Sequence, residues 1–294
     1  MLPFVFFDES RMGPLHAYGI ACALGFFAFD WAMMRQARRR GLDPADFRVL
    51  TVWMYVLGAF VAWLVDAVFY HPPGRSVTST LLSFQGFSST GGIVGAILAG
   101  VVWRHVWIGR EEGALRVRRR VRPEPMLPPA DVVVSTFPLG WAFGRLGCAL
   151  IHDHPGIVVP KGTLSSLLAV GWPTGPEDGV HHVLGPLHVV TGASSARFDL
   201  GLLECLLLFA IAAWFSRRWS KARRLGDDVV AGSLVYGPIR FFLDFLRPED
   251  GPGGDLRHLG LTFAQYFCIA IVGLAITLLV KRRVASGAEP AQVG

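Results

Sequence analysis

Charged residues are scarce in this sequence. Asp, Glu, Lys and Arg make up 17% of its 294 residues, whereas 52% are hydrophobic. A soluble globular domain carries roughly 25% charged residues, so the composition excludes an ordinary soluble protein. Together with a mean hydropathy of +0.44, it predicts an integral membrane protein.

Cysteine is scarce too, and it is not arranged for cross-linking. The four cysteines lie in apolar segments and form no CxxC pair: Cys22, Cys148, Cys205 and Cys268. The sequence therefore indicates neither a disulfide framework nor a zinc site, and we expect no cofactor and no metal ion. It also lacks an inverted repeat, which leaves a transporter as a weak alternative only.

Long apolar runs are what the sequence has instead. Seven of them are separated by polar connections, at residues 15–34, 49–70, 81–108, 130–151, 199–216, 229–247 and 259–280. A helix of about 20 residues crosses the ~30 Å of a bilayer core. Most of the runs reach that length, and 199–216 is near the lower limit. We predict an all-α integral membrane protein with seven transmembrane helices.

Basic residues mark one side of the predicted membrane protein. Alternate connections and the C-terminal end carry Arg35, Arg38, Arg39, Arg40, Arg110, Arg116, Arg118, Arg119, Arg120, Arg122, Arg217, Arg218, Lys221, Arg223, Arg224, Lys281, Arg282 and Arg283. The other connections hold only Arg11, Arg75, Lys161, Arg197, Arg247 and Arg257. The positive-inside rule then places the N-terminus outside and the C-terminus in the cytoplasm. Because the basic runs abut membrane helices, we assign them to orientation and to attraction of anionic lipid, and not to nucleic acid.

Two longer stretches lie outside the predicted helices. Residues 152–198 are rich in Gly, Pro, Ser and His, and a connection of that length is typical of a lid or a small head segment, here on the outer, periplasmic side. Residues 284–294 look like a disordered cytoplasmic tail. We therefore predict one polytopic membrane domain over 1–283. No cleavable signal peptide is expected, because the first apolar run is long and its positive charges follow it.

Arg145 and Arg240 are the two basic residues well inside the predicted spans. A cationic side chain near the bilayer centre costs at least ~2.5–3.5 kcal/mol on insertion scales, so it normally faces a partner, a cavity or a substrate. Near Arg145, Gly140, Gly144 and Gly147 share one helical face, where small residues let a helix or a lipid headgroup approach. The planar guanidinium group of an arginine can donate two parallel hydrogen bonds to a lipid phosphate. The alternative is an arginine that only ties helices together.

Arg240 has an acidic residue one helical turn away. Asp244 lies four positions later and can pair with it, and Arg247 extends the same face outward. Pro238 removes a helical hydrogen bond and predicts a kink beside Arg240. The stretch is either a self-neutralised pair that makes a buried arginine tolerable, or an anion site with a tuned carboxylate.

The third apolar run contains a polar, glycine-rich stretch, Ser88-Ser89-Thr90-Gly91-Gly92. Irregular backbone at membrane depth is tolerated only where it is buried or lines a cavity. Gly91 and Gly92 could present backbone N–H groups to a substrate. Close helix packing is the equally open alternative.

Taken together, these stretches resemble the bacterial phosphatidylglycerol–prolipoprotein diacylglyceryl transferases. Residues 131–156 follow that family's signature helix, including Gly144-Arg145-Leu146-Gly147, and residues 236–248 follow its late-helix motif. Further matches cover 16–19, 86–95, 197–204 and 261–265. The resemblance spans nearly the whole chain and implies the same seven spans and orientation, in the bacterial inner membrane.

Several positions depart from the family's motifs. Thr90 stands where the motif has His, Cys148 where it has Asn, and Asp244 where the late helix has Glu. Ile151-His152-Asp153 replaces Asn-Gly-Glu, and Phe198 replaces another His. The phosphate-binding arginines are thus kept, while hydrogen-bonding partners and the candidate base are changed.

The resemblance implies that diacylglyceryl moves from phosphatidylglycerol to the lipobox cysteine thiol of a prolipoprotein signal peptide, the first step of lipoprotein maturation. Glycerol phosphate leaves at the outer leaflet, and a thioether forms. The substrate-binding residues implied are Arg145, Arg240, Arg247, Gly144, Gly91 and Gly92. The catalytic positions implied are Arg240, Asp244, Tyr18, Asp153, His152 and Thr90. Tyr18 could bond a phosphate or glyceryl oxygen, and Asp244 would orient Arg240.

The residue that deprotonates the thiol is not evident from the sequence. A cysteine thiol has a pKa of ~8.5 and needs a base or a positive field, and the hydroxyl of Thr90 does not accept protons near neutral pH. Candidates near the outer helix ends are His16, His152, His154, His258 and Asp153. Each histidine is more often an interfacial residue than a base, and a metal site at His152 and His154 would need partners from elsewhere.

The changed positions 90, 148 and 153 leave a second function open. In this alternative, the protein is a catalytically diverged relative that binds or transfers phospholipid, or that modifies another acceptor.

Overall fold

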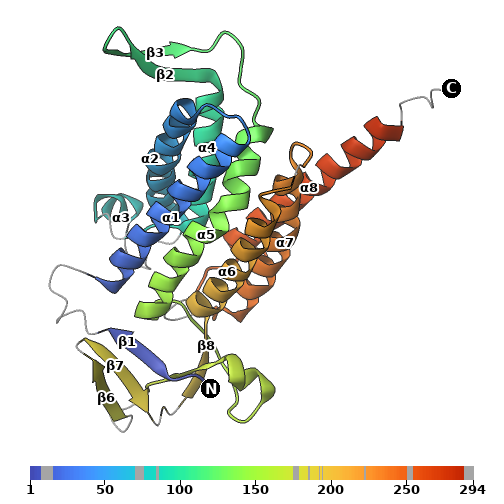
Figure 1. Ribbon diagram of the computed structural model, residues 1–294. Helices are drawn as coiled ribbons and strands as arrows, with labels where there is room; N and C mark the ends of the chain where they lie inside the picture. The colour runs from blue at the N-terminus through green and yellow to red at the C-terminus, as the bar shows by residue number, and fades with distance from the viewer. Residues whose placement is uncertain are drawn as a thin grey trace. The chain divides into compact units, whose positions relative to one another are not determined.

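The computed structural model describes residues 1–7, 16–69, 76–83, 86–174, 179–184, 186–191, 193, 195–221, 223–249 and 254–287. The described chain is mostly helical (Figure 1). Its helices are α1 (Ala17–Arg39), α2 (Pro44–Phe69), α3 (Val77–Ser83), α4 (Ser89–His105), α5 (Leu127–Ile151), α6 (Leu200–Arg218), α7 (Asp227–Leu243) and α8 (Phe263–Gly287). Its strands are β1 (Phe4–Phe7), β2 (Val106–Glu111), β3 (Ala114–Arg119), β4 (Pro155–Val158), β5 (Val170–Trp172), β6 (Gly179–Leu184), β7 (Leu187–Thr191) and β8 (Ser195–Asp199).

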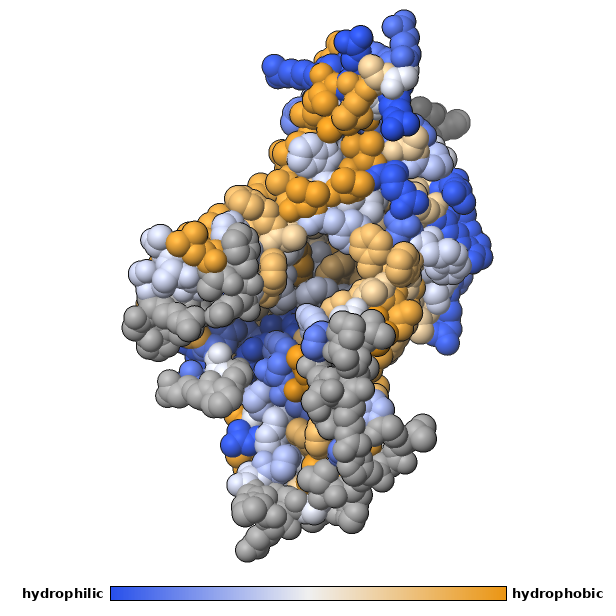
Figure 2. Space-filling view, turned by 90° about the vertical axis from the view of Figure 1, so that its left-hand side faces the viewer, coloured by the Kyte–Doolittle hydropathy of each residue, from blue (hydrophilic) through white to orange (hydrophobic). Residues whose placement is uncertain are grey.

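Six helical stretches of the described chain are long and apolar enough to cross a membrane. They are α1, α2, α5, α6, the stretch Asp227–Leu246 that includes α7, and Phe263–Val284 of α8. Large apolar side chains are exposed on them, among them Phe27, Phe60 and Phe242, and hydrophobic residues form much of the surface seen in Figure 2. A soluble monomer rarely exposes such surface, so this is a multi-pass membrane protein of mainly helical fold.

The predicted third span, 81–108, is built differently from these six. It contains the end of α3 and all of α4, and strand β2 begins at Val106. Helix α4 has 17 residues, which is at the short end of what crosses a bilayer. A seventh span and the orientation of the termini therefore stay predictions.

The chain divides into two compact units, each described by itself. The α2–α4 unit comprises Ala32–Val134, Ala222–Leu234 and Ile269–Gly294. The arginine unit comprises Met1–Trp31, Ser135–Lys221 and Val235–Cys268. Helix α8 continues to Gly287, past the predicted start of the tail at residue 284, and residues 288–294 lie outside the described residues.

In the α2–α4 unit, the glycine-rich stretch forms a close helix contact. A Cβ atom on Gly91 would lie 2.9 Å from the Cα of Ala62 on α2. The side chain of Ser88 accepts a hydrogen bond from the Gly91 N–H at 3.3 Å, and its carbonyl accepts one from Gly92 at 3.0 Å. Because both glycine amides are already engaged in the first turn of α4, the geometry supports the packing alternative.

The basic run that begins at Arg110 is not helical. It forms the antiparallel hairpin β2–β3, paired from Val106 with Arg119 to Glu111 with Ala114. The side chains of β3 are exposed. Alternating basic residues on a two-stranded ribbon stay solvated on both faces. The mainly helical structure is consistent with the predicted all-α membrane protein, and the short strands lie in its connections.

The head segment of the arginine unit contains two small antiparallel sheets. Strands β1, β7 and β6 form one, and β4, β8 and β5 form the other. Figure 1 shows strands β1, β6, β7 and β8 gathered beyond the ends of α5 and α6. The segment predicted as a head, 152–198, thus folds together with the N-terminal strand, whose Phe4 pairs with Val190.

Glycines of α5 let it pack closely on α1. A Cβ atom on Gly140 would lie 2.6 Å from the Cβ of Phe29, and one on Gly147 would lie 2.9 Å from the Tyr18 ring. Gly144 lies between them, and a Cβ there would meet nothing within 4 Å. Two of the three glycines therefore serve helix packing, and the third borders open space.

Candidate functional site

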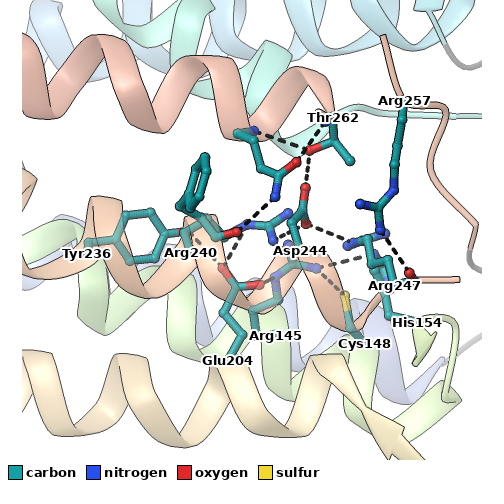
Figure 3. Close-up of polar contacts among 12 residues, drawn as sticks. Arg145, Cys148, His154, Glu204, Tyr236, Arg240, Asp244, Arg247, Arg257 and Thr262 are labelled. Atoms are coloured by element: carbon teal, nitrogen blue, oxygen red, sulfur yellow. Dashed lines mark hydrogen bonds and ion pairs between the residues drawn. The ribbon is translucent and has the colours of Figure 1, made fainter. Parts of the chain in front are cut away.

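The two arginines of the predicted spans lie in one polar cluster of the arginine unit (Figure 3). Arg145 comes from α5 and Arg240 from α7, and their side chains are only 4% and 9% exposed. Carboxylates from α6 and from the turn after α7 surround them, together with a hydroxyl just before α8. The side chains termed the arginine cluster are Arg145, Glu204, Tyr236, Arg240, Asp244, Arg247 and Thr262.

Glu204 on α6 is the carboxylate that both arginines share. Its Oε2 lies 2.8 Å from Nε of Arg145, and its Oε1 lies 3.7 Å from Nε of Arg240. The hydroxyl of Tyr236 donates a 2.7 Å hydrogen bond to Oε1. Because a buried charge is tolerated only when it is paired, Glu204 neutralises and orients both guanidinium groups. Sequence reasoning missed this residue, although it is the single acidic residue of α6.

Asp244 organises the other half of the cluster. It pairs with Nη1 of Arg240, as the four-residue spacing predicted, and with Nε of Arg247 at 3.1 Å. Its second oxygen accepts a hydrogen bond from the hydroxyl of Thr262. The end of α7 tightens into a 3-10 turn at Asp244–Leu246. This turn keeps Arg247 within reach of the carboxylate, whose side chain is 0% exposed.

A reciprocal cap at the start of α8 positions Thr262. Its N–H donates to the side-chain oxygen of Gln265 at 2.9 Å, and the N–H of Gln265 donates to Oγ1 of Thr262 at 3.2 Å. This is a capping box, which satisfies two helix-end donors at once. The side chain of Gln265 also donates to the carbonyl of Phe241 at 3.0 Å, so the end of α7 and the start of α8 are joined beside Asp244.

The arginine cluster carries more positive than negative charge. Three guanidinium groups, of Arg145, Arg240 and Arg247, share two carboxylates. Burial, and then the charge of Arg240, lower the pKa of Arg247, as expected for a cation held near another cation. An excess of buried guanidinium groups over carboxylates suits a phosphate, which can accept two parallel hydrogen bonds from one guanidinium group.

The far end of Arg145 reaches a second group of polar side chains. Its Nη1 lies 3.2 Å from Nε2 of His154 and 3.7 Å from Sγ of Cys148. His154 is bonded through Nδ1 to the carboxylate of Asp153. The donor atoms of Cys148, Asp153 and His154 lie within 4.8 Å of one another, a spacing that suits a metal ion. The guanidinium of Arg145 points at two of these donors, and its charge opposes a cation there.

His152 does not join this second group. Its Nδ1 lies 2.5 Å from Oδ2 of Asp199, its Nε2 lies 2.8 Å from the carbonyl of Val5, and its ring stacks on Phe4 at 3.9 Å. Both ring nitrogens are thus engaged by groups of the head segment and its neighbouring strand, and neither is directed at Arg145. These contacts place His152 at the junction of α5 and the head segment, and its catalytic role stays a prediction.

The other predicted site residues have described contacts of their own. Tyr18 is 41% exposed and packs on Gly147. Thr90, Gly91 and Gly92 belong to the α2–α4 unit, where Thr90 is buried. Their catalytic and binding roles stay predictions.

Comparison with known proteins identifies one family. The model of the prolipoprotein diacylglyceryl transferase family matches residues 9–281, which include the whole arginine cluster. Curated relatives named phosphatidylglycerol–prolipoprotein diacylglyceryl transferase are similar along nearly their full length. That of Bordetella avium is 29% identical over 96% of this chain and 98% of its own. That of Idiomarina loihiensis is 28% identical over 92% of this chain and 90% of its own. This chain therefore belongs to the prolipoprotein diacylglyceryl transferase family.

Proposed function

We propose that this protein transfers the diacylglyceryl group of phosphatidylglycerol to the lipobox cysteine thiol of a prolipoprotein signal peptide. It acts as a seven-span protein of the bacterial inner membrane, with the N-terminus outside, the C-terminus in the cytoplasm and the site facing the outer leaflet. The observation that carries the proposal is the arginine cluster, in which three guanidinium groups share two carboxylates among apolar helices.

The reaction needs positive charge where its leaving group departs. As the acceptor sulfur bonds to the glyceryl carbon, the carbon–oxygen bond breaks and its electron pair goes to the phosphate of glycerol phosphate. Arg145 and Arg240 stabilise that charge. Glu204 and Asp244 hold the guanidinium groups of these two arginines in place before the reaction begins. Little reorganisation therefore accompanies the reaction. The open space beside Gly144 lets the headgroup approach Arg145 along its own helix.

A reconstituted transfer assay tests the proposal. Purified protein is incubated with phosphatidylglycerol vesicles and a lipobox peptide, and mass spectrometry follows the diacylglyceryl peptide and glycerol phosphate. We expect Arg145→Ala and Arg240→Ala to lower the rate by about 10²-fold or more, because each removes a preorganised donor to the departing charge. Arg118→Ala, on the exposed strand β3, is the control with an unchanged rate. Folded wild-type protein that yields no product overturns the proposal.

A relative that binds or transfers phospholipid, or that modifies another acceptor, is the second candidate. One observation favours it: Thr90, at the position of the motif histidine, is a buried hydroxyl and not a proton acceptor. This candidate predicts saturable binding of phosphatidylglycerol without thioether product. Detection of the thioether excludes its non-catalytic form.

A further inference from the structure

The turn that ends α5 brings one histidine back to Arg145. Its first residue, His152, adopts a left-handed backbone conformation with φ of 52°. Such a conformation is unfavourable in a non-glycine residue and persists only where the surrounding structure holds it. The side chain of His152 is held at this turn by Asp199 and Val5, which contact its two ring nitrogens. Beyond the turn, Nε2 of His154 lies 3.2 Å from Nη1 of Arg145.

The partners of His154 decide which ring nitrogen carries the hydrogen. A guanidinium group only donates hydrogen bonds, so Nε2 must accept the one from Arg145. A carboxylate only accepts, so Nδ1 holds the hydrogen and donates it to Asp153. The ring is therefore a neutral imidazole whose single lone pair points from Nε2 toward Arg145.

The surroundings keep this imidazole neutral near pH 7. Burial is the largest cause that lowers the pKa of His154, and the charges of Arg145 and Arg247 lower it further, while Asp153 opposes them. Arg145 and Cys148 lie near the ring from α5, and the charge of Arg247 acts on it from the turn after α7. A histidine whose pKa lies below its ordinary ~6.5 is unprotonated at neutral pH, so one ring nitrogen keeps a lone pair that can accept a proton.

Resting on the proposed function, we infer that Nε2 of His154 accepts the proton of the lipobox thiol and that Asp153 is its positioning residue. The S–H bond breaks and its proton goes to Nε2. The thiolate bonds to the glyceryl carbon, and the electron pair of the broken carbon–oxygen bond leaves with glycerol phosphate. Asp153 stabilises the imidazolium through Nδ1–H until water takes the proton.

Arg145 connects this proton transfer to phosphate binding. It contacts His154 through Nη1 and Glu204 through Nε. A phosphate that takes Nη1 removes the donor from Nε2 of His154 and frees the lone pair for the thiol. Deprotonation is therefore coupled to the arrival of the headgroup. Both ring nitrogens of His152 are engaged by Asp199 and Val5, whereas Nε2 of His154 faces Arg145, so the geometry selects His154 for this role.

The pH dependence of His154→Gln tests the inference. At pH 7 we expect the rate to fall by about 10²-fold, which is typical for loss of a general base. The deficit should shrink to within about tenfold near pH 9.5, because a thiol with a pKa of ~8.5 ionises there without help. A peptide with selenocysteine at the acceptor position, whose selenol is more acidic, should shrink the deficit at pH 7. Asp153→Asn should weaken the base and shift the lower limb of the pH profile.

Controls separate this inference from the proposed function. His258→Gln removes an exposed histidine and should leave the profile unchanged. Wild-type transfer together with an unimpaired His154→Gln enzyme overturns the inference while the proposed function stands. A deficit in His154→Gln that is equal at all pH values and with both acceptors also overturns it, because that is the signature of a structural role. Absence of transfer by the folded wild-type protein overturns both.

Discussion

At the scale of single residues, the energetics of the site depend on two buried carboxylates that each serve two arginines. Glu204 contacts Arg145 and Arg240, and Asp244 contacts Arg240 and Arg247. Burying a charge is costly, and the cost is offset only while every partner is present. Removing one carboxylate leaves buried cations uncompensated. We therefore expect the carboxylates to stabilise the fold as well as to orient the guanidinium groups.

The first prediction concerns Glu204→Ala. Because it breaks a buried ion pair, we expect the free energy of unfolding to fall by about 3–5 kcal/mol, measured by thermal unfolding in detergent. The control is Glu111→Ala, which removes a carboxylate that is 44% exposed and paired with Arg118. That change should cost less than about 1 kcal/mol. Equal stability of the two variants would contradict the assignment of Glu204 as the shared partner.

The second prediction, also at the residue scale, is a pH dependence of stability. The pKa of His154 is lowered in the folded protein, chiefly by burial, so below its ordinary ~6.5 the unfolded chain takes up a proton that the folded chain does not. This contribution to stability is fully present above pH ~6.5 and is lost as the pH falls through that value toward the lower folded pKa. His154→Gln should flatten the fall between pH 7.5 and 5 in unfolding experiments. A variant with the wild-type slope would show that the pKa of His154 is not lowered.

At the scale of the secondary-structure element, α5 combines packing and binding on one helix. Gly140 and Gly147 bring it against α1, while Gly144 between them borders open space and precedes Arg145. A helix that lacked these glycines would stand farther from α1. The glycine at 144 is not required for that packing, so its small size fits a position that a headgroup approaches.

The third prediction separates these roles by matched alanine substitutions in α5. Gly140→Ala forces its new Cβ to within 2.6 Å of Phe29, and such overpacking costs about 1–3 kcal/mol. Gly144→Ala meets nothing within 4 Å, so its unfolding temperature should not fall. We expect it instead to raise the KM for phosphatidylglycerol in the transfer assay. A strong loss of stability in Gly144→Ala would place another element against that position.

At the scale of the whole molecule, membrane orientation determines whether the arginine cluster meets the outer leaflet. The basic hairpin β2–β3 and the head segment are predicted to lie on opposite sides of the membrane. The described chain has six helices long and apolar enough to span, and α4 would have to be the seventh for the predicted orientation to hold at both termini.

The fourth prediction tests this topology with single cysteines at exposed sites. Ala114→Cys lies at the tip of the hairpin and Ser165→Cys in the head segment. We expect an impermeant thiol reagent to label Ser165→Cys in intact spheroplasts and to label Ala114→Cys only after lysis. Labelling of both from outside would overturn the seven-span orientation. Wild-type protein provides the background, since Cys148, Cys205 and Cys268 are buried and Cys22 is partly buried.

The sequence by itself determined the features that have a local origin. Apolar runs predict membrane helices because partition into lipid depends on about 20 consecutive residues. The pair Arg240 and Asp244 was predictable because residues four apart share one helix face. The motif around Arg145 indicated the family because its residues are contiguous in the sequence.

Only the tertiary structure decided the features whose partners are distant in the chain. Glu204 could not be matched to Arg145 from sequence, because helical periodicity does not say which other helix faces it. His152 and His154 have the same chemistry and nearly the same position, yet contacts with Asp199 and Val5 engage the first and leave the second facing Arg145. Side-chain type and spacing thus established which groups could form a phosphate site, and packing between distant segments established which of them meet.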